Sequence, residues 1–129
     1  MSPAFSSGTD SVAGRFVATF RNSPAGPVVE AAGELDHDSA SCLQTVLRRA
    51  LAVRPAPAVV VVDLAGLTFF DSSGLNTLVQ ARRDAECQDT VVHLARPSDI
   101  VARVLEITGA DQIFPVDKDV PPGPHTPAA

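Results

Sequence analysis

The sequence predicts an α/β domain in which three crossover helices pack on a small mixed sheet of four to five strands. One observation is the near-continuous apolar run 58–64 (AVVVVDL), which is typical of a strand covered on both faces. Another is the change to a helical period after Asp38, where apolar residues recur at spacings of three and four. Strand-like and helix-like segments then alternate along the chain, and this order predicts parallel neighbouring strands.

The composition is that of one soluble domain. The chain has 129 residues, and 45% of them are hydrophobic, which suffices for a core without a metal or disulfide staple. The small, polar start 1–12 predicts a disordered arm, and the Pro-rich end 118–129 predicts a disordered tail. The folded domain is therefore expected over 13–117. Because the sequence shows no basic signal-like start and no long apolar span, we expect a soluble cytoplasmic protein that does not enter a membrane.

The N-terminal half of the pattern predicts a hairpin followed by a helix. Residues 15–20 and 27–32 have the character of strands, and the turn-rich segment 22–27 joins them. The helix is expected to begin at Asp38 or Ser39, since either side chain can accept a hydrogen bond from a free backbone N–H. Its apolar stripe consists of Leu43, Val46, Leu47, Ala50 and Leu51. The prolines at positions 55 and 57 end it.

The C-terminal half predicts two more helices and two further strands after the valine-rich run. A helix is expected over about 73–87, and a buried strand over 90–94. The third helix has the clearest ends, because Ser98 can cap its start and Gly109 suits a left-handed C-terminal cap. Residues 113–116 predict a short last strand.

Charge, cysteines and histidines argue against several classes of function. The net charge is −5 and the basic residues form no concentrated face, so nucleic-acid binding is not expected. Cys42 and Cys87 lack the paired spacings of a zinc site, and two reduced thiols are predicted. His93 lies inside an apolar strand pattern, where a core histidine with satisfied hydrogen bonds is expected rather than a ligand. No phosphate-binding glycine motif occurs, so no cofactor and no metal are expected.

The segment 69–75, FFDSSGL, admits three interpretations: a helix cap, a catalytic nucleophile or a switch. A nucleophile elbow requires glycine two residues before and two residues after the serine. Ser72 lacks the first of these and Ser73 lacks both, which argues against a hydrolase. Capping by Asp71 or Ser72 explains one polar side chain and leaves the others without a role.

A phosphoacceptor at the first turn of a helix also has a physical basis. Free backbone N–H groups and the positive end of the helix favour an added phosphate. The adjacent Asp71 opposes it, because a phosphate adds about −1.5 to −2 charge beside a carboxylate. The net effect inside the domain is therefore expected to be small, whereas a docked partner would meet new charge and bulk.

A second cluster is the acidic turn 33–40 (GELDHDSA), between the second strand and the first helix. A solvated loop with a helix cap is the simplest explanation of it. Loops that follow neighbouring parallel strands, however, lie side by side at one edge of a sheet. If the second and third predicted strands are such neighbours, Asp36 approaches Asp71 and Ser73.

Together, the two clusters resemble the STAS-domain family of bacterial anti-sigma-factor antagonists. Three segments carry the resemblance: GELD at 33–36, DLAGL at 63–67 leading into DSSGL at 71–75, and the C-terminal helix 97–109. The similarity covers residues 14–116 in unbroken order and implies a STAS-like fold. The chain departs from the family's pattern at Asn76, Thr77, Ala110 and the turn 22–27. None of these positions is the acceptor, so the departures concern the choice of partner more than the switch.

The resemblance implies roles for particular residues. The second serine of the family's DSSG motif is the phosphoacceptor, here Ser73, and Asp71 takes part in phosphorylation and partner recognition. Asp36 stands where the family has its other functional acid. Ser72 and Gly74 complete the motif as supporting residues.

The family also implies a non-enzymatic mechanism with named classes of partner. Its partner is an anti-sigma factor that is also an ATP-dependent serine kinase. The unphosphorylated antagonist binds this kinase and so frees a sigma factor, phosphorylation ends the binding, and a serine phosphatase resets the switch. A monomer or weak dimer is expected.

Two other classes of function stay open from the sequence. One is a STAS scaffold or adaptor in an assembly that involves no sigma factor, such as a stress-signalling or lipid-transport complex. The other is a small hydrolase that uses Ser72 or Ser73, for which His37 or His93 would have to act as the base.

Overall fold

The structure, a computed structural model, describes residues 11–120 and contains one six-stranded mixed sheet. The strands lie in chain order across the sheet: β1 (Ser11–Ala13), β2 (Phe16–Arg21), β3 (Val28–Leu35), β4 (Val59–Phe70), β5 (Val91–Ala95) and β6 (Val116–Asp117). The first three strands are antiparallel, and β3 to β6 are parallel. The mixed sheet and the predicted hairpin are therefore confirmed.

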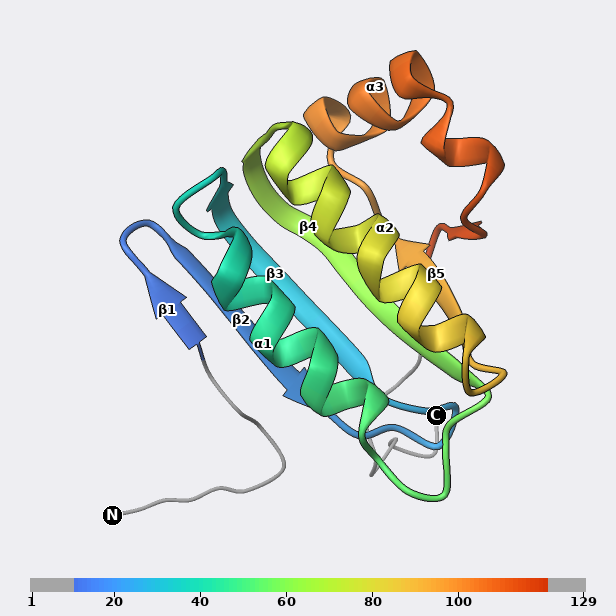
Figure 1. Ribbon diagram of the computed structural model, residues 1–129. Coiled ribbons are helices and arrows are strands. Elements are labelled where there is room, and N and C mark those ends of the chain that lie inside the picture. Colours follow the sequence, from blue (N-terminus) through green and yellow to red (C-terminus); the bar gives the residue numbers. More distant parts are fainter. Residues whose placement is uncertain (1–10, 121–129) are drawn as a thin grey trace, which may run out of the picture.

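Three helices complete the fold: α1 (Ala40–Leu51), α2 (Ser72–Glu86) and α3 (Asp99–Thr108). In Figure 1, α1 and α2 lie side by side on the near face of the sheet, while α3 lies beyond the end of β5. Because α1 and α2 connect parallel strands, both begin at the same edge of the sheet, where β3 and β4 end. The two polar clusters of the sequence, in segments 33–40 and 69–75, lie at this edge.

The sheet is larger than the predicted four to five strands. The extra strand, β1, begins at Ser11 and so lies partly inside the expected arm 1–12, because the turn at Gly14 folds it back onto β2. The last strand was expected over 113–116, but β6 begins only at Val116. The remainder of the expected arm, and the part 121–129 of the expected tail, lie outside the described residues.

Strand β4 extends six residues past the predicted run 58–64, to Phe70. Its second half pairs with β3 alone, because β5 pairs only with the segment Val59–Asp63. The pairing with β3 has irregularities between Glu30 and Ala32 and between Gly33 and Glu34. Such bulges bend a strand and increase its twist. Figure 1 shows β4 curving over towards the start of α2.

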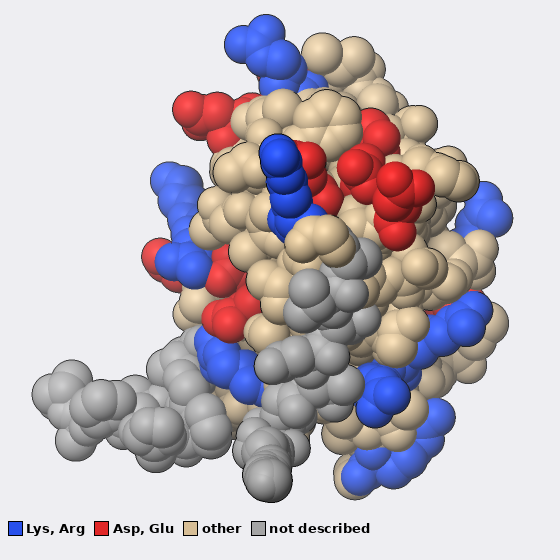
Figure 2. Space-filling model, turned by 90° about the vertical axis from the view of Figure 1, so that its left-hand side faces the viewer, with Lys and Arg blue, Asp and Glu red and all other residues tan. Residues whose placement is uncertain are grey.

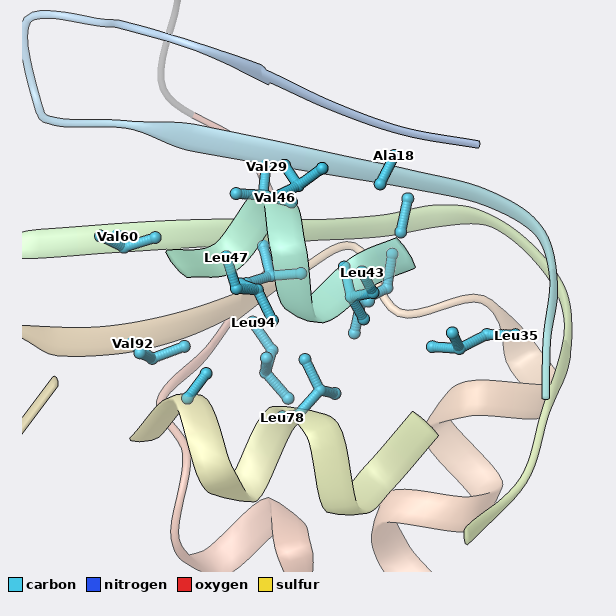
Figure 3. Packing of buried hydrophobic residues seen from close by; sticks show 14 of the residues in the cluster. Ala18, Val29, Leu35, Leu43, Val46, Leu47, Val60, Leu78, Val92 and Leu94 are labelled. Atoms are coloured by element: carbon cyan, nitrogen blue, oxygen red, sulfur yellow. The ribbon is translucent and has the colours of Figure 1, made fainter. Parts of the chain in front are cut away.

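The main core fills the space between the sheet and the helices. Leu43, Val46 and Leu47 of α1 meet Leu78 of α2 over the sheet, and these side chains are 0–2% exposed. Figure 3 shows them in one layer, with Leu35 at the end of the layer that lies nearest to the end of β3. Burial of such aliphatic side chains contributes about 1.5–3 kcal/mol each to folding. The core thus anchors both helices whose first turns reach the candidate site.

The opposite face of the sheet carries ion pairs. Asp63, only 4% exposed, accepts hydrogen bonds from Arg96, with an Nη2–Oδ2 distance of 2.6 Å. The hydrogen bond to Asp63, and then the attraction of its charge, raise the pKa of Arg96. His93 Nδ1 lies 2.9 Å from Asp117 Oδ2, so the predicted satisfied histidine is present, half-buried on this face rather than within the main core.

Two predicted helix caps differ from the structure. Ser39 and Ser98 occupy the capping positions of α1 and α3, but neither side chain accepts a hydrogen bond from its own helix. The Ser98 hydroxyl donates instead to the carbonyl of Leu67, 2.9 Å away, and so holds the start of α3 against β4. The C-terminal cap by Gly109, with φ of 79°, is confirmed.

Cys42 lies in the core and Cys87 on the surface, and no disulfide joins them. Within residues 11–120, no helix is both long enough and apolar enough to cross a membrane.

Candidate functional site

The register of β3 and β4 brings the two polar clusters to the same place. Leu35 and Phe70 are paired residues at the ends of these parallel strands. The next residues along the chain are Asp36 and Asp71, so each acid begins the loop that leaves its strand. The predicted neighbourhood of the two acids is therefore present. Their hydrogen bonds, however, are made within their own loops and not with one another.

Asp71 caps helix α2. Its backbone is extended, and its Oδ1 accepts hydrogen bonds from the N–H groups of Ser73, at 2.9 Å, and Gly74, at 3.4 Å. The sequence left the cap open between Asp71 and Ser72, and the geometry assigns it to Asp71. Leu75 N–H bonds to the Asp71 carbonyl, which completes the first turn. The N–H groups at this helix start are thus largely occupied already.

The two serines differ in their surroundings. Ser72 is exposed, whereas Ser73 is half-buried. The Ser73 carbonyl accepts a hydrogen bond from Thr77 Oγ1 at 3.0 Å, but no residue in 11–120 forms a hydrogen bond with the Ser73 hydroxyl. A partly exposed hydroxyl without a structural bond is available for chemistry at its oxygen.

Gly74 allows the helix to approach the end of the sheet. A Cβ atom at this position would lie 2.7 Å from both Cγ and Cδ2 of Leu35 and 3.0 Å from Cε1 of Phe70. Carbon atoms in favourable contact lie about 3.5–4.0 Å apart. The missing side chain therefore lets the first turn of α2 pack directly on the last residues of β3 and β4, which positions Ser73.

A hydrogen-bond network holds Asp36 in the loop after β3. Its Oδ1 accepts from the N–H groups of Asp38, at 3.0 Å, and Ser39, at 3.1 Å. The Ser39 hydroxyl is buried and lies 2.8 Å from the carbonyl oxygen of Glu34 and 3.1 Å from Asp36 Oδ1. It also accepts the N–H of Asp36 at 2.9 Å. Ser39 thus fixes the acidic loop, a role that the sequence interpretation as a simple cap missed.

Carboxylates dominate the charge at this edge of the sheet. Glu34, Asp36, Asp38 and Asp71 lie on the two loops or at the strand end, and Arg15 is paired with Glu34 at 3.3 Å. Arg15, Glu34, Asp36 and Asp38 line a shallow hollow beside the loop. We use the name acidic rim for Arg15, Glu34, Asp36, Asp38 and Asp71. In the upper part of the face shown in Figure 2, red side chains flank a blue one.

Neither described histidine, His37 or His93, forms a hydrogen bond with Ser72 or Ser73. His93 is paired in register with Val61, nine residues before Phe70, which corresponds to about 30 Å along a strand. Its ring nitrogen contacts Asp117 instead. His37 is exposed and makes no hydrogen bond with a described residue. The third histidine of the sequence, at position 125, lies outside the described residues. In the described part of the chain, no cluster of His, Cys, Asp or Glu has the size and geometry of a metal site.

We expect the cap and the charge of Asp71 to be separable by mutation. Asp71→Asn keeps a side-chain oxygen that can accept from Ser73 and Gly74, so the free energy of unfolding should change by only a few tenths of a kcal/mol. Asp71→Ala removes the cap and should cost about 1 kcal/mol. Urea denaturation of both variants measures the difference. Equal losses for Asn and Ala would show that attraction between the carboxylate and the helix, rather than the hydrogen bonds, stabilises this turn.

The chain is similar to known proteins in sequence and in fold. The family model described as the STAS domain matches residues 17–121. A protein of Mycobacterium tuberculosis named as a candidate anti-anti-sigma factor, Rv2638, is 27% identical over 99 residues, which cover 77% of this chain and 67% of that protein.

Solved structures share the fold. The crystal structure of an anti-sigma factor antagonist from Mycobacterium paratuberculosis has a TM-score of 0.74 at 22% identity, covering 85% of this chain and 92% of that one. The Bacillus cell fate determinant SpoIIAA in its phosphorylated form has a TM-score of 0.57 at 20% identity, covering 87% and 91% of the two chains. At these identities the likeness concerns the arrangement of strands and helices.

Proposed function

Because the chain belongs to the STAS domain family, we propose that it is an anti-sigma-factor antagonist controlled by phosphorylation of Ser73. In its unphosphorylated form it binds an anti-sigma factor with serine kinase activity, and that binding releases a sigma factor. Phosphorylation of Ser73 ends the binding. The observation that carries the proposal is the Ser73 hydroxyl, which is partly exposed, makes no hydrogen bond with residues 11–120 and lies at the edge where both acidic loops begin.

The local geometry supports a switch that acts on a partner rather than on the fold. Asp71 Oδ1 already accepts from Ser73 and Gly74, so a phosphate on Ser73 would compete with it for these N–H groups. The added charge of about −1.5 to −2 would also be repelled by the Asp71 carboxylate. The phosphate is therefore directed outward, into the space that a docked partner would occupy. Charge and bulk at that position weaken the complex without unfolding the domain.

The proposal includes the remaining parts of the switch. A serine phosphatase removes the phosphate and restores binding. The protein itself is not an enzyme, works in the cytoplasm where a sigma factor meets RNA polymerase, and is a monomer or weak dimer. The names of the relatives in the two mycobacteria support the antagonist role. No histidine among residues 11–120 forms a hydrogen bond with Ser72 or Ser73, which supports the non-enzymatic part.

Replacing Ser73 by aspartate tests the switch. We expect Ser73→Asp to bind the serine-kinase anti-sigma factor at least about tenfold more weakly than the wild type, because a charge next to Asp71 is desolvated unfavourably in the complex. One carboxylate carries less charge than a phosphate, so the phosphorylated protein should bind more weakly still. Titration calorimetry with the purified kinase measures both affinities.

The matched control is Ser72→Asp, which adds the same charge one residue earlier on an exposed side chain. Its affinity should stay closer to that of the wild type. Equal affinity of Ser73→Asp and wild type would count against the switch. Light scattering that showed a large homogeneous assembly of this chain would favour a scaffold over an antagonist.

A further inference from the structure

Among the phenylalanines of residues 11–120, one side chain lies on the surface and the others are buried. Phe16, Phe20, Phe70 and Phe114 are 2–8% exposed, whereas Phe69 is 43% exposed. A Phe that is 43% exposed forfeits a substantial part of the roughly 1.5–3 kcal/mol that its full burial would contribute to folding. Packing in the core therefore does not explain why a phenylalanine stands at position 69.

Phe69 lies directly beside the proposed switch. It is paired across the strands with Glu34 of the acidic rim, and it stands two residues before Asp71. Paired residues of neighbouring strands present their side chains to the same face of a sheet. Leu35 and Phe70, the next pair, are 0% and 3% exposed on the helix-covered face, so Glu34 and Phe69 belong to the other face.

A second exposed apolar side chain lies near the same edge. The hydrogen bond from Ser98 Oγ to the Leu67 carbonyl holds the first turn of α3 against β4, two residues before Phe69. Ile100, in that first turn, is 37% exposed. Phe69 and Ile100 thus each stand two residues after one of the partners in this hydrogen bond.

We propose that Phe69 and Ile100 form the apolar centre of the surface on which the serine-kinase anti-sigma factor docks, with the acidic rim as its charged border. The inference rests on the proposed function and specifies the partner's chemistry. Four carboxylates face one arginine at this edge, so the complementary surface presents Lys or Arg side chains around an apolar one. Protein interfaces commonly combine a desolvated apolar or aromatic anchor with a polar border.

This arrangement also explains why a phosphate on Ser73 would be effective. The anchor contributes affinity only where water is excluded, and charges near such a centre are poorly hydrated in the complex. A partner that covers both Phe69 and Ser73 would have to desolvate the phosphate together with the anchor. One modification would therefore weaken the apolar and the charged parts of the interface together.

The first test compares two exposed apolar residues. With the kinase that phosphorylates Ser73, Phe69→Ala should raise KM for this protein by about tenfold or more and leave kcat unchanged, because Phe69 binds the kinase without touching the acceptor hydroxyl. Ile100→Ala should act in the same direction. The control Ile107→Ala removes a side chain that is 75% exposed two turns further along α3, and it should leave KM unchanged. Thermal unfolding of each variant verifies that the fold is intact. Equal KM values for wild type and Phe69→Ala would overturn the inference while the switch at Ser73 remains.

The second test needs no kinase. A synthetic amphipathic peptide with leucines on one face and arginines on the other should shift amide NMR signals at Phe69, Ile100 and the rim. Phe69→Ala should weaken this binding by about tenfold, and Ile107→Ala should not. Shifts centred on another surface, or equal binding by Phe69→Ala, would overturn the assignment of the surface. Peptide binding at Phe69 without any kinase that phosphorylates Ser73 would retain the surface and refute the proposed function.

Discussion

Incubated with its kinase and ATP, the wild-type protein is expected to take up one phosphate, and Ser73→Ala none. The Ser73 hydroxyl is partly exposed and makes no hydrogen bond with residues 11–120, so its removal deletes the acceptor without removing a structural contact. The free energy of unfolding should accordingly change by no more than about 0.5 kcal/mol. Intact-mass spectrometry before and after incubation measures the phosphate, and urea denaturation measures the stability.

The matched control is Ser72→Ala, which leaves Ser73 and its cap in place and should still gain a single phosphate. A phosphate mapped to Ser72, or a gain of mass by Ser73→Ala, would refute the assignment of the acceptor. The same pair of variants addresses the hydrolase alternative. Covalent labelling of either serine by an organophosphate probe would indicate an activated nucleophile, which the position of His93 argues against.

Much of the fold followed from local sequence signals. The hairpin of β2 and β3, the valine-rich start of β4 and the three helices have periods and end residues that identify them without tertiary information. The neighbourhood of Asp36 and Asp71 followed from a topological rule, because parallel neighbouring strands end at the same edge. The N-terminal cap of α2 could be narrowed to Asp71 or Ser72 from local sequence alone, because both residue types favour capping and both stand just before the apolar period of the helix.

Other features depend on contacts between distant segments, which a pattern along the chain does not contain. The second half of β4 is a strand because β3 pairs with it, and its exposed residues at 65, 66, 68 and 69 give no regular alternation. Ser39 and Ser98 are good capping residues by type, but both hydroxyls bond to strand carbonyls, at Glu34 and Leu67. Phe69 has the composition of a core residue, and only the cross-strand pair with Glu34 shows which way it faces.

The close contact between Gly74 and Leu35 predicts a large and specific effect on stability. Gly74→Ala places a methyl group 2.7 Å from two carbons of Leu35, a fully buried side chain at the end of the core layer seen in Figure 3. Alanine is favoured over glycine inside a helix by about 1 kcal/mol, whereas overpacking a core costs about 1–3 kcal/mol. Because Phe70 blocks the adjacent space at 3.0 Å, the clash should prevail, and we expect a net loss of about 1–2 kcal/mol.

The compensating change is Leu35→Ala, which alone should cost about 2–5 kcal/mol by opening a cavity. In the double variant the two Leu35 carbons at 2.7 Å are gone and the new methyl group occupies part of that cavity, so the contact with Phe70 Cε1 at 3.0 Å is the close one that remains. We therefore expect the double variant to lose at least about 1 kcal/mol less than the sum of the single losses. Urea denaturation of the wild type, the single variants and the double variant measures this coupling.

A control cycle combines Gly74→Ala with Val92→Ala. Val92 is paired with Val60, ten residues before Phe70 along β4, and should couple to Gly74 by less than about 0.5 kcal/mol. Additive losses of unfolding free energy for Gly74→Ala and Leu35→Ala would contradict the contact.

The same variants connect packing with the switch, since Ser73 belongs to the turn that the methyl group displaces. Gly74→Ala should slow phosphorylation of Ser73, and Leu35→Ala in the same chain should restore it, because relief of the clash lets the first turn of α2 return to the ends of β3 and β4.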